Sequence, residues 1–188
     1  SIKNNTWNLI GHSMGGGTIT SMTLEKPNRV NSLVFVAGAL YHSPGGTSSL
    51  VLSYPPISRW FQIIGRNFII KEKNFKSMLK SAYQEIPTAV EVKGYYEHFT
   101  VPGTEAAFID IVRTSANISI DLIKEIETPS LLIWGDLDTW VPLEQGERLL
   151  NDLPNAKLQV IMESGHCPME THADEFNNLL SDFLNNNL

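Results

Sequence analysis

The feature that most constrains this chain is the hexapeptide Gly-His-Ser-Met-Gly-Gly at residues 11–16. A short apolar run ending at Ile10 precedes it, and residues 14–26 continue with helical character up to Pro27. A serine on a sharp turn between a strand and a helix exposes a nucleophilic hydroxyl, and glycines two residues to either side let the strand and the helix approach. The helix N-terminus beside the serine also favours developing negative charge. This stretch therefore predicts a nucleophile at Ser13.

Three other interpretations of the same stretch are weaker. The glycines at residues 15–17 are not followed by the Gly-Lys-Ser/Thr that a phosphate-binding loop needs. Ser13 stands where a dinucleotide-binding fingerprint has its second glycine. A Gly-x-Ser-x-Gly pattern also arises by chance in glycine-rich loops, but the flanking strand and helix patterns favour the nucleophile.

Composition narrows the class of protein and its partners. A chain of 188 residues with 42% hydrophobic and 18% charged residues is ordinary for one globular domain with a substantial core. The net charge of −6, with both signs interspersed, argues against nucleic acid or an anionic membrane surface as a partner. No apolar run approaches the roughly 20 residues of a membrane span. The single cysteine, Cys167, excludes an internal disulfide framework and is compatible with a reducing, cytoplasmic location.

Apolar runs of strand length alternate with segments of helical spacing along the chain. The predicted strands are residues 6–10, 30–40, 129–134 and 157–162, and the predicted core helices are residues 14–26, 142–150 and 171–184. Strands that alternate with helices indicate an α/β fold with a parallel, doubly wound sheet. Thr171 followed by Asp174 is a weak capping-box match at the start of the last helix.

A long section, residues 42–125, carries apolar residues at helical spacing and no strand-like alternation. It is therefore predicted to be a helical insertion that divides the core into residues 1–41 and 126–188. Most of its aromatic side chains are expected to pack within the insertion, and a minority facing a cleft would favour an apolar or aromatic substrate. These aromatic residues are Trp60, Phe61, Phe68, Tyr83, Tyr95, Tyr96 and Phe99.

A serine nucleophile needs a base within hydrogen-bonding reach and an acid that orients the base. His166 directly follows the fourth predicted strand, and Asp136 and Asp138 directly follow the third. The carboxyl ends of parallel strands share one edge of the sheet with Ser13, so these residues are the candidates. Either aspartate could instead be an ordinary turn residue.

The remaining histidines are expected to have no part in the chemistry. His12 precedes the serine and is expected to point below the sheet as a structural residue. The others are expected at the rim or surface: His42, His98 and His172. Cys167 is expected to be a small packing residue rather than a thiol nucleophile. No His-x-x-x-His or Cys-x-x-Cys pairing is present, so no metal and no cofactor are implied.

Three blocks together resemble the signatures of the α/β-hydrolase superfamily, and most of all its lipase, esterase and carbon–carbon hydrolase branch. They are residues 11–16, Gly-Asp-Leu-Asp-Thr-Trp-Val-Pro at 135–142 and Ser-Gly-His-Cys-Pro-Met-Glu at 164–170. The resemblance implies that Ser13 is the nucleophile, Asp138 the acid and His166 the general base. It further implies that the backbone N–H of Met14 is an oxyanion donor and that the insertion is a cap.

The chain departs from that family in one respect. The family's nucleophile usually follows the fifth of eight strands, whereas here it follows the first predicted strand. Only the late strands of the fold are therefore expected, and residues 7–10 would form an exposed apolar edge. We expect a C-terminal portion of a larger hydrolase whose N-terminal half, in the same or a separate chain, supplies the second oxyanion donor. Self-association through the exposed edge is the alternative.

The resemblance implies a serine hydrolase that works through an acyl-enzyme. The leading expectation is a carboxylesterase that acts on small-molecule esters with an apolar acyl or aromatic group. A carbon–carbon bond hydrolase, a peptidase and a cofactor-free haloperoxidase use the same three residues and remain alternatives. A non-catalytic binding module on this fold is the alternative of a different class.

Overall fold

A computed structural model describes residues 6–41, 71–104, 106–107 and 118–186. The chain forms two compact units. The first comprises Ser1–Tyr41, Ala82–Gln84 and Ile118–Leu188, and the second comprises His42–Ser81 and Glu85–Asn117. The domain boundaries expected for the insertion, residues 42–125, stay a prediction, because residues 42–70 lie outside the described residues.

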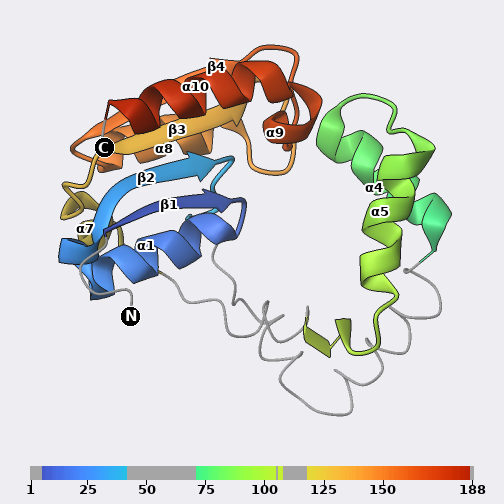
Figure 1. Cartoon of the computed structure of the whole chain (residues 1–188), viewed down its shortest axis with the longest axis horizontal. Coiled ribbons are helices and arrows are strands. Elements are labelled where there is room, and N and C mark those ends of the chain that lie inside the picture. The colour runs from blue at the N-terminus through green and yellow to red at the C-terminus, as the bar shows by residue number, and fades with distance from the viewer. Residues whose placement is uncertain (1–5, 42–70, 105, 108–117, 187–188) are drawn as a thin grey trace. The chain divides into compact units, whose positions relative to one another are not determined.

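The first unit is built on four parallel strands in the order β1-β2-β3-β4 (Figure 1). They are β1 (Trp7–His12), β2 (Val30–Val36), β3 (Ser130–Gly135) and β4 (Ala156–Ile161). All four correspond to strands predicted from the sequence, with ends that differ by a few residues. The parallel α/β sheet expected from the alternation of strands and helices is confirmed.

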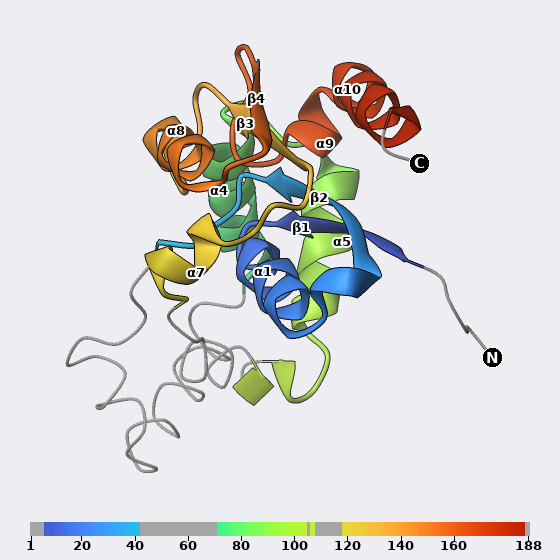
Figure 2. The same ribbon diagram turned by 90° about the vertical axis from the view of Figure 1, so that its left-hand side faces the viewer.

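Helices cover both faces of this sheet (Figure 2). They are α1 (Gly15–Glu25), the 3₁₀ turn η1 (Pro27–Arg29), α7 (Ile120–Lys124), α8 (Leu143–Asp152), α9 (Pro168–Thr171) and α10 (Ala173–Asn185). Residues of α1, α7 and α8 share one core cluster with the sheet, and α10 packs against the other face. The sheet is therefore doubly wound. Of the helices that the structure describes, none is long and apolar enough to cross a membrane.

The two core clusters follow from the pleat of β2. Leu33 and Phe35 point to the face covered by α1 and α8, whereas Val34 and Val36 point to the face covered by α10. Successive side chains of a strand alternate between faces, so a strand covered on both sides reads as a continuous apolar run. Each fully buried side chain of this size contributes about 1.5–3 kcal/mol relative to exposure.

The last helix begins differently from the sequence prediction. Thr171 is the final residue of α9, and α10 starts at Ala173 after His172, whose side chain makes no capping hydrogen bond. The capping box expected at Thr171 and Asp174 is therefore wrong. The physical reason is Pro168, which occupies the first turn of a separate short helix, so that the Thr171 hydroxyl donates back to the Cys167 carbonyl at 3.3 Å.

The second unit holds α5 (Ala89–Phe99) and most of α4 (Glu72–Tyr83). The ring of Phe75 lies 5.7 Å from that of Tyr96 and 5.0 Å from that of Phe99, centroid to centroid. The expected packing of aromatic side chains within the insertion is confirmed for Tyr96 and Phe99. It is wrong for Tyr83, which belongs to the first unit and donates a hydrogen bond to Glu170. Trp60, Phe61 and Phe68 lie outside the described residues.

The glycines give a matched pair of stability predictions. A Cβ on Gly135, at the end of β3, would lie 2.2 Å from the carbonyl oxygen of Ser164, whereas a Cβ on Gly17 in α1 would meet nothing within 4 Å. We expect Gly135→Ala to lower the free energy of unfolding by about 1–3 kcal/mol through overpacking. Gly17→Ala is expected to raise it by about 0.5–1 kcal/mol through helix propensity. Urea denaturation measures both, and a Gly135→Ala variant as stable as the wild type would contradict the close approach.

Candidate active site

The turn after β1 displays Ser13 in a strained conformation. Its φ of 52° lies in the left-handed region, which non-glycine residues rarely adopt. Hydrogen bonds fix the turn: the Ser13 N–H donates to Val36 O at 2.9 Å, and the Ser13 carbonyl accepts from the N–H groups of Gly16 and Ala39. The surrounding backbone therefore holds the serine at the carboxyl edge of the sheet, as the strand–turn–helix pattern predicts.

The glycines of the motif contribute unequally. A Cβ on Gly11 would lie 2.5 Å from the carbonyl oxygen of Gly15, and a Cβ on Gly16 would lie 2.9 Å from a methyl carbon of Leu40. A Cβ on Gly15 would meet nothing within 4 Å. The expectation that glycine is needed two residues to either side of the serine therefore holds at residue 11 and is wrong at residue 15. The second close approach falls one residue later.

The structure brings Asp138 and His166 together. Nδ1 of His166 lies 2.8 Å from Oδ2 of Asp138, and both side chains are buried. The other carboxylate oxygen, Oδ1, accepts from the N–H groups of Trp140 and Val141 at 2.8 and 2.9 Å. Because the ring nitrogen beside a carboxylate must donate, Nδ1 carries the proton and Nε2 of the neutral ring keeps its lone pair.

Asp136, the other candidate acid, has a different role. Its Oδ1 accepts from the backbone N–H of Ser164 at 3.2 Å, and the N–H of Leu137 donates to the Ser164 carbonyl at 2.9 Å. These bonds connect the loop after β3 to the loop after β4. Of the two aspartates, only Asp138 therefore contacts the imidazole of His166.

His12 lies in the site, contrary to the expectation that it points below the sheet. Its ring centroid is 4.7 Å from that of His166, and its Nε2 lies 2.9 Å from the His166 carbonyl oxygen. The reason is that His12 is the last residue of β1, so its side chain lies at the edge where the loops meet. Burial lowers the pKa of His12, and the hydrogen bond to the His166 carbonyl opposes that shift.

The hydrogen bond between Ser13 and His166 stays a prediction. Among the hydrogen bonds of the described residues, none joins the Ser13 hydroxyl to the His166 imidazole, and the Met14 N–H has no acceptor. Catalytic hydrogen bonds are often long in unliganded sites and tighten when substrate binds. The imidazole of His166 nevertheless lies against the residue that directly precedes Ser13.

Sequence analysis missed a contact from residues 82–84. The His166 N–H donates to the Ala82 carbonyl at 2.6 Å, and a Cβ on Gly165 would lie only 2.2 Å from that oxygen. The buried Tyr83 donates a hydrogen bond from its hydroxyl to Glu170. The only signal in the sequence was the glycine before His166, which marks a close approach without naming its partner.

The other side chains expected to be inert largely are. His98 is exposed and hydrogen-bonded to its own helix, and His172 is half-buried beside Thr171, while His42 lies outside the described residues. Cys167 is buried, and burial raises the pKa of its thiol to about 12. A thiol with so little thiolate at neutral pH is a packing residue rather than a nucleophile.

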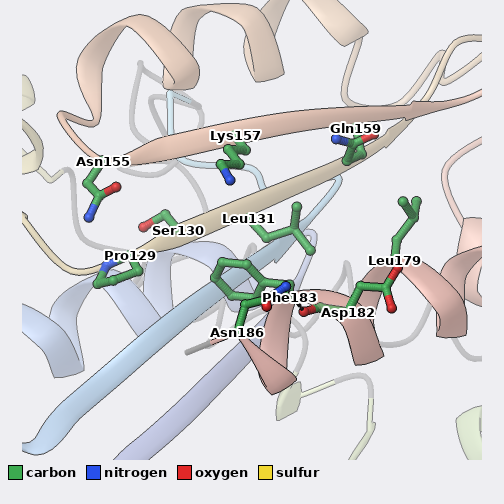
Figure 3. A pocket seen from close by; sticks show the side chains of 10 residues that line it. All are labelled: Pro129, Ser130, Leu131, Asn155, Lys157, Gln159, Leu179, Asp182, Phe183 and Asn186. Carbon is green, nitrogen blue, oxygen red and sulfur yellow. Dashed lines mark hydrogen bonds between the residues drawn. The ribbon is translucent and has the colours of Figure 1, made fainter. Parts of the chain in front are cut away.

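A cavity of about 310 Å³ lies away from these loops (Figure 3). Residues of β3, β4 and α10 line it. Several of these residues lie near the amino ends of the strands, opposite the edge that carries Ser13. Apolar side chains such as Phe183 and Leu131 mix there with Lys157 and Asp182. Within the described ranges, no group of three or more His, Cys, Asp or Glu side chains is arranged to hold a metal ion.

The parallel sheet, the serine turn and the buried histidine–aspartate pair define an α/β-hydrolase. Residues 3–172 match the family model Hydrolase_4, described as serine aminopeptidase, S33, and the chain belongs to this family.

Relatives of similar sequence are named as hydrolases. The chain is 31% identical over 182 residues to a 2-hydroxy-6-oxononadienedioate/2-hydroxy-6-oxononatrienedioate hydrolase from a Pseudomonas species, covering 94% of this chain and 62% of that protein. It is 28% identical over 178 residues to the uncharacterized hydrolase YugF of Bacillus subtilis, covering 94% and 64%. The chain thus spans less than two thirds of the length of these relatives.

Solved structures share the fold at low sequence identity. A meta-cleavage product hydrolase from Pseudomonas fluorescens IP01 gives a TM-score of 0.76 at 23% identity, covering 97% of this chain and 65% of that one. A bromoperoxidase from Bacillus anthracis gives 0.75 at 21% identity, covering 98% and 69%. A thermophilic esterase from Thermogutta terrifontis gives 0.73 at 19% identity, covering 97% and 65%. These likenesses establish the α/β-hydrolase fold expected from the three sequence blocks.

The raised pKa of Cys167 gives a chemical prediction. With a pKa of about 12 in place of 9.0, the thiolate fraction at pH 8 falls by a factor on the order of 10³. We expect iodoacetamide to alkylate Cys167 at least about 10³-fold more slowly in the native chain than in the urea-unfolded chain. Mass spectrometry of timed samples measures both rates. Similar rates in the two states would show that the thiol is accessible and ordinary.

Proposed function

We propose that this chain carries the catalytic residues of a serine hydrolase, with Ser13 as nucleophile, His166 as general base and Asp138 as the acid that orients it. The observation that supports the proposal is the buried hydrogen bond between Asp138 and His166, 2.8 Å long, beside the turn that displays Ser13. A buried imidazole fixed in one tautomer by a carboxylate has the arrangement that general-base catalysis requires.

In the proposed reaction, the Ser13 hydroxyl attacks a substrate carbonyl carbon as Nε2 of His166 takes its proton. The carboxylate of Asp138 stabilises the resulting imidazolium through Nδ1. The N–H of Met14 donates to the oxyanion of the tetrahedral intermediate. The intermediate collapses when the bond to the leaving group breaks and His166 delivers the proton to that group. Water then attacks the acyl-enzyme, again with His166 as base, and releases the acid and the free serine.

The identity of the leaving group separates two candidate functions. In carbon–carbon hydrolysis the leaving atom is a carbon. It must depart as a stabilised carbanion, which then accepts the proton from His166. The relatives named as 2-hydroxy-6-oxononadienedioate/2-hydroxy-6-oxononatrienedioate hydrolases and as a 2-hydroxy-6-oxo-6-phenylhexa-2,4-dienoate hydrolase favour this reaction for the present chain. Carboxylester hydrolysis, the leading expectation from the sequence, is the second candidate. It is supported by the proposed catalytic residues and by a fold shared with an esterase. The half-exposed indole of Trp140, 5.3 Å from the His166 ring, supports an apolar or aromatic substrate group in either case.

The outer edge of β1 is part of the proposal. β1 pairs only with β2 among the described strands, and Ile10 on it is 48% exposed. An exposed apolar strand edge is a template for further pairing. We propose that polypeptide corresponding to the additional length of the relatives packs along this edge and supplies the second oxyanion donor, either from the same or from a separate chain. Self-association through β1 is the alternative.

Covalent labelling tests the roles of Ser13 and Asp138. A fluorophosphonate probe is expected to modify Ser13 in the full-length protein, and Ser13→Ala is expected to abolish the modification. Asp138→Asn should slow labelling by about 10⁴-fold, because the imidazole loses its correct tautomer. Mass spectrometry of the modified peptide measures the rate.

The neighbouring aspartate is the matched control. Asp136→Asn keeps an oxygen acceptor for the Ser164 N–H and does not contact the imidazole, so its labelling rate should stay within a few-fold of the wild type. Equal slowing by both substitutions would indicate general damage to the loops. Absence of labelling in the wild-type protein would favour a non-catalytic module.

Steady-state kinetics distinguishes the two candidate functions. We expect kcat/KM for a 2-hydroxy-6-oxo-dienoate to exceed that for p-nitrophenyl esters by at least about 10-fold, a difference of about 1.4 kcal/mol in transition-state stabilisation. Loss of dienoate absorbance and release of p-nitrophenol measure the two rates, and Ser13→Ala serves as the blank for both. Rapid ester turnover without cleavage of the dienoate would assign the protein as a carboxylesterase.

A further inference from the structure

His166 is bound through almost all of its polar atoms. Its N–H donates to Ala82 O at 2.6 Å, its carbonyl oxygen lies 2.9 Å from Nε2 of His12, and its Nδ1 lies 2.8 Å from Asp138. Within the part of the chain that the structure describes, its Nε2 takes part in no hydrogen bond. Three bonds from three separate segments therefore fix this residue and leave one ring nitrogen for chemistry.

The His166 carbonyl determines which ring nitrogen of His12 carries a proton. A carbonyl oxygen has no hydrogen, so Nε2 of His12 must be the donor, and a neutral His12 ring then lacks a proton on Nδ1. His166 has the opposite tautomer, with its proton on Nδ1. The charged or titratable groups acting on His12 are His166, Asp138 and Glu170, and burial lowers its pKa despite the two carboxylates.

We infer that His12 is a positioning residue for the general base, because it joins the turn that carries Ser13 to the backbone of His166. The inference rests on the proposed function. His12 directly precedes Ser13, so the hydrogen bond to the His166 carbonyl sets the separation of the nucleophile turn from the base loop. A misplacement of about 1 Å at such a site costs about 10²-fold in rate.

A neutral ring at this position also suits the reaction. The His12 and His166 ring centroids are 4.7 Å apart, so a positive charge on His12 would repel the imidazolium that forms on His166. A neutral His12 lets the base accept its proton without that repulsion. The same residue therefore fixes the base in space without placing a positive charge beside it.

Three substitutions separate the hydrogen bond from the ring. In glutamine, the side-chain nitrogen lies the same number of bonds from Cα as Nε2 of histidine, whereas in asparagine the nitrogen is one bond closer. We expect His12→Asn and His12→Phe to lower kcat by about 10- to 100-fold with KM within about 2-fold of the wild type. His12→Gln is expected to restore kcat to within about 3-fold, because its amide reaches the same carbonyl. Equal kcat for wild type and His12→Phe, at equal thermal stability, would overturn the inference.

A spectroscopic measurement tests the hydrogen bond between His12 and the His166 carbonyl without relying on enzyme activity. Long-range ¹H–¹⁵N spectra of the full-length protein at pH 7 should show His12 as the neutral Nε2–H tautomer, and the carbonyl ¹³C signal of His166 should shift in His12→Phe but not in His12→Gln. A neutral Nδ1–H tautomer or an imidazolium at His12 would overturn the inference. If Ser13 fails to react with fluorophosphonate while these signals appear as expected, the proposed function fails and the link between the two loops stands.

Discussion

The candidate site depends on one buried carboxylate. The Asp138 side chain is fully excluded from solvent, and removing an ionised carboxylate from water costs several kcal/mol unless donors replace the water. Two donors, the N–H groups of Trp140 and Val141, belong to its own turn, so the loop after β3 orients the carboxylate by itself. The third donor, Nδ1 of His166, arrives from the loop after β4. The orientation of the imidazole is therefore determined by the turn that follows β3.

Close backbone contacts make this arrangement possible. Gly135 lies against the carbonyl groups of Ser164 and Gly165, and Gly165 in turn lies against Ala82 and Tyr83, at distances that a Cβ would not allow. Without side chains at these points, three segments distant in sequence come within hydrogen-bonding reach at the carboxyl edge of the parallel sheet. The chemistry of the site thus depends on residues that themselves carry no reactive group.

Much of this organisation could be predicted from the sequence, because it follows from the periodic spacing of apolar residues and from short local motifs. Apolar runs such as Leu33–Ala37 predict strands buried on both faces, and the turn around Ser13 is specified by its neighbours. Asp138 was separated from Asp136 only by resemblance, since both follow the same strand. The structure distinguishes them by a single hydrogen bond to His166.

The errors have separate physical causes. His12 was expected below the sheet because it precedes the serine, but it is the last residue of β1 and its side chain lies among the loops that meet at this edge. The start of α10 was misplaced because Pro168 initiates its own short helix. The contact between Ala82 and His166 joins two backbone groups, and a backbone group has no sequence signature.

The hydrogen bonds among these loops restrict how the protein can change over evolution. Surface connections usually accept insertions and deletions freely, because little else depends on their length. Here the loop after β4 is bound to the end of β1 through His12 and to the loop after β3 through Asp136 and Asp138. Adding a residue to any one of them would shift the other two. Insertions and deletions are therefore expected in the segments that take no part in these hydrogen bonds.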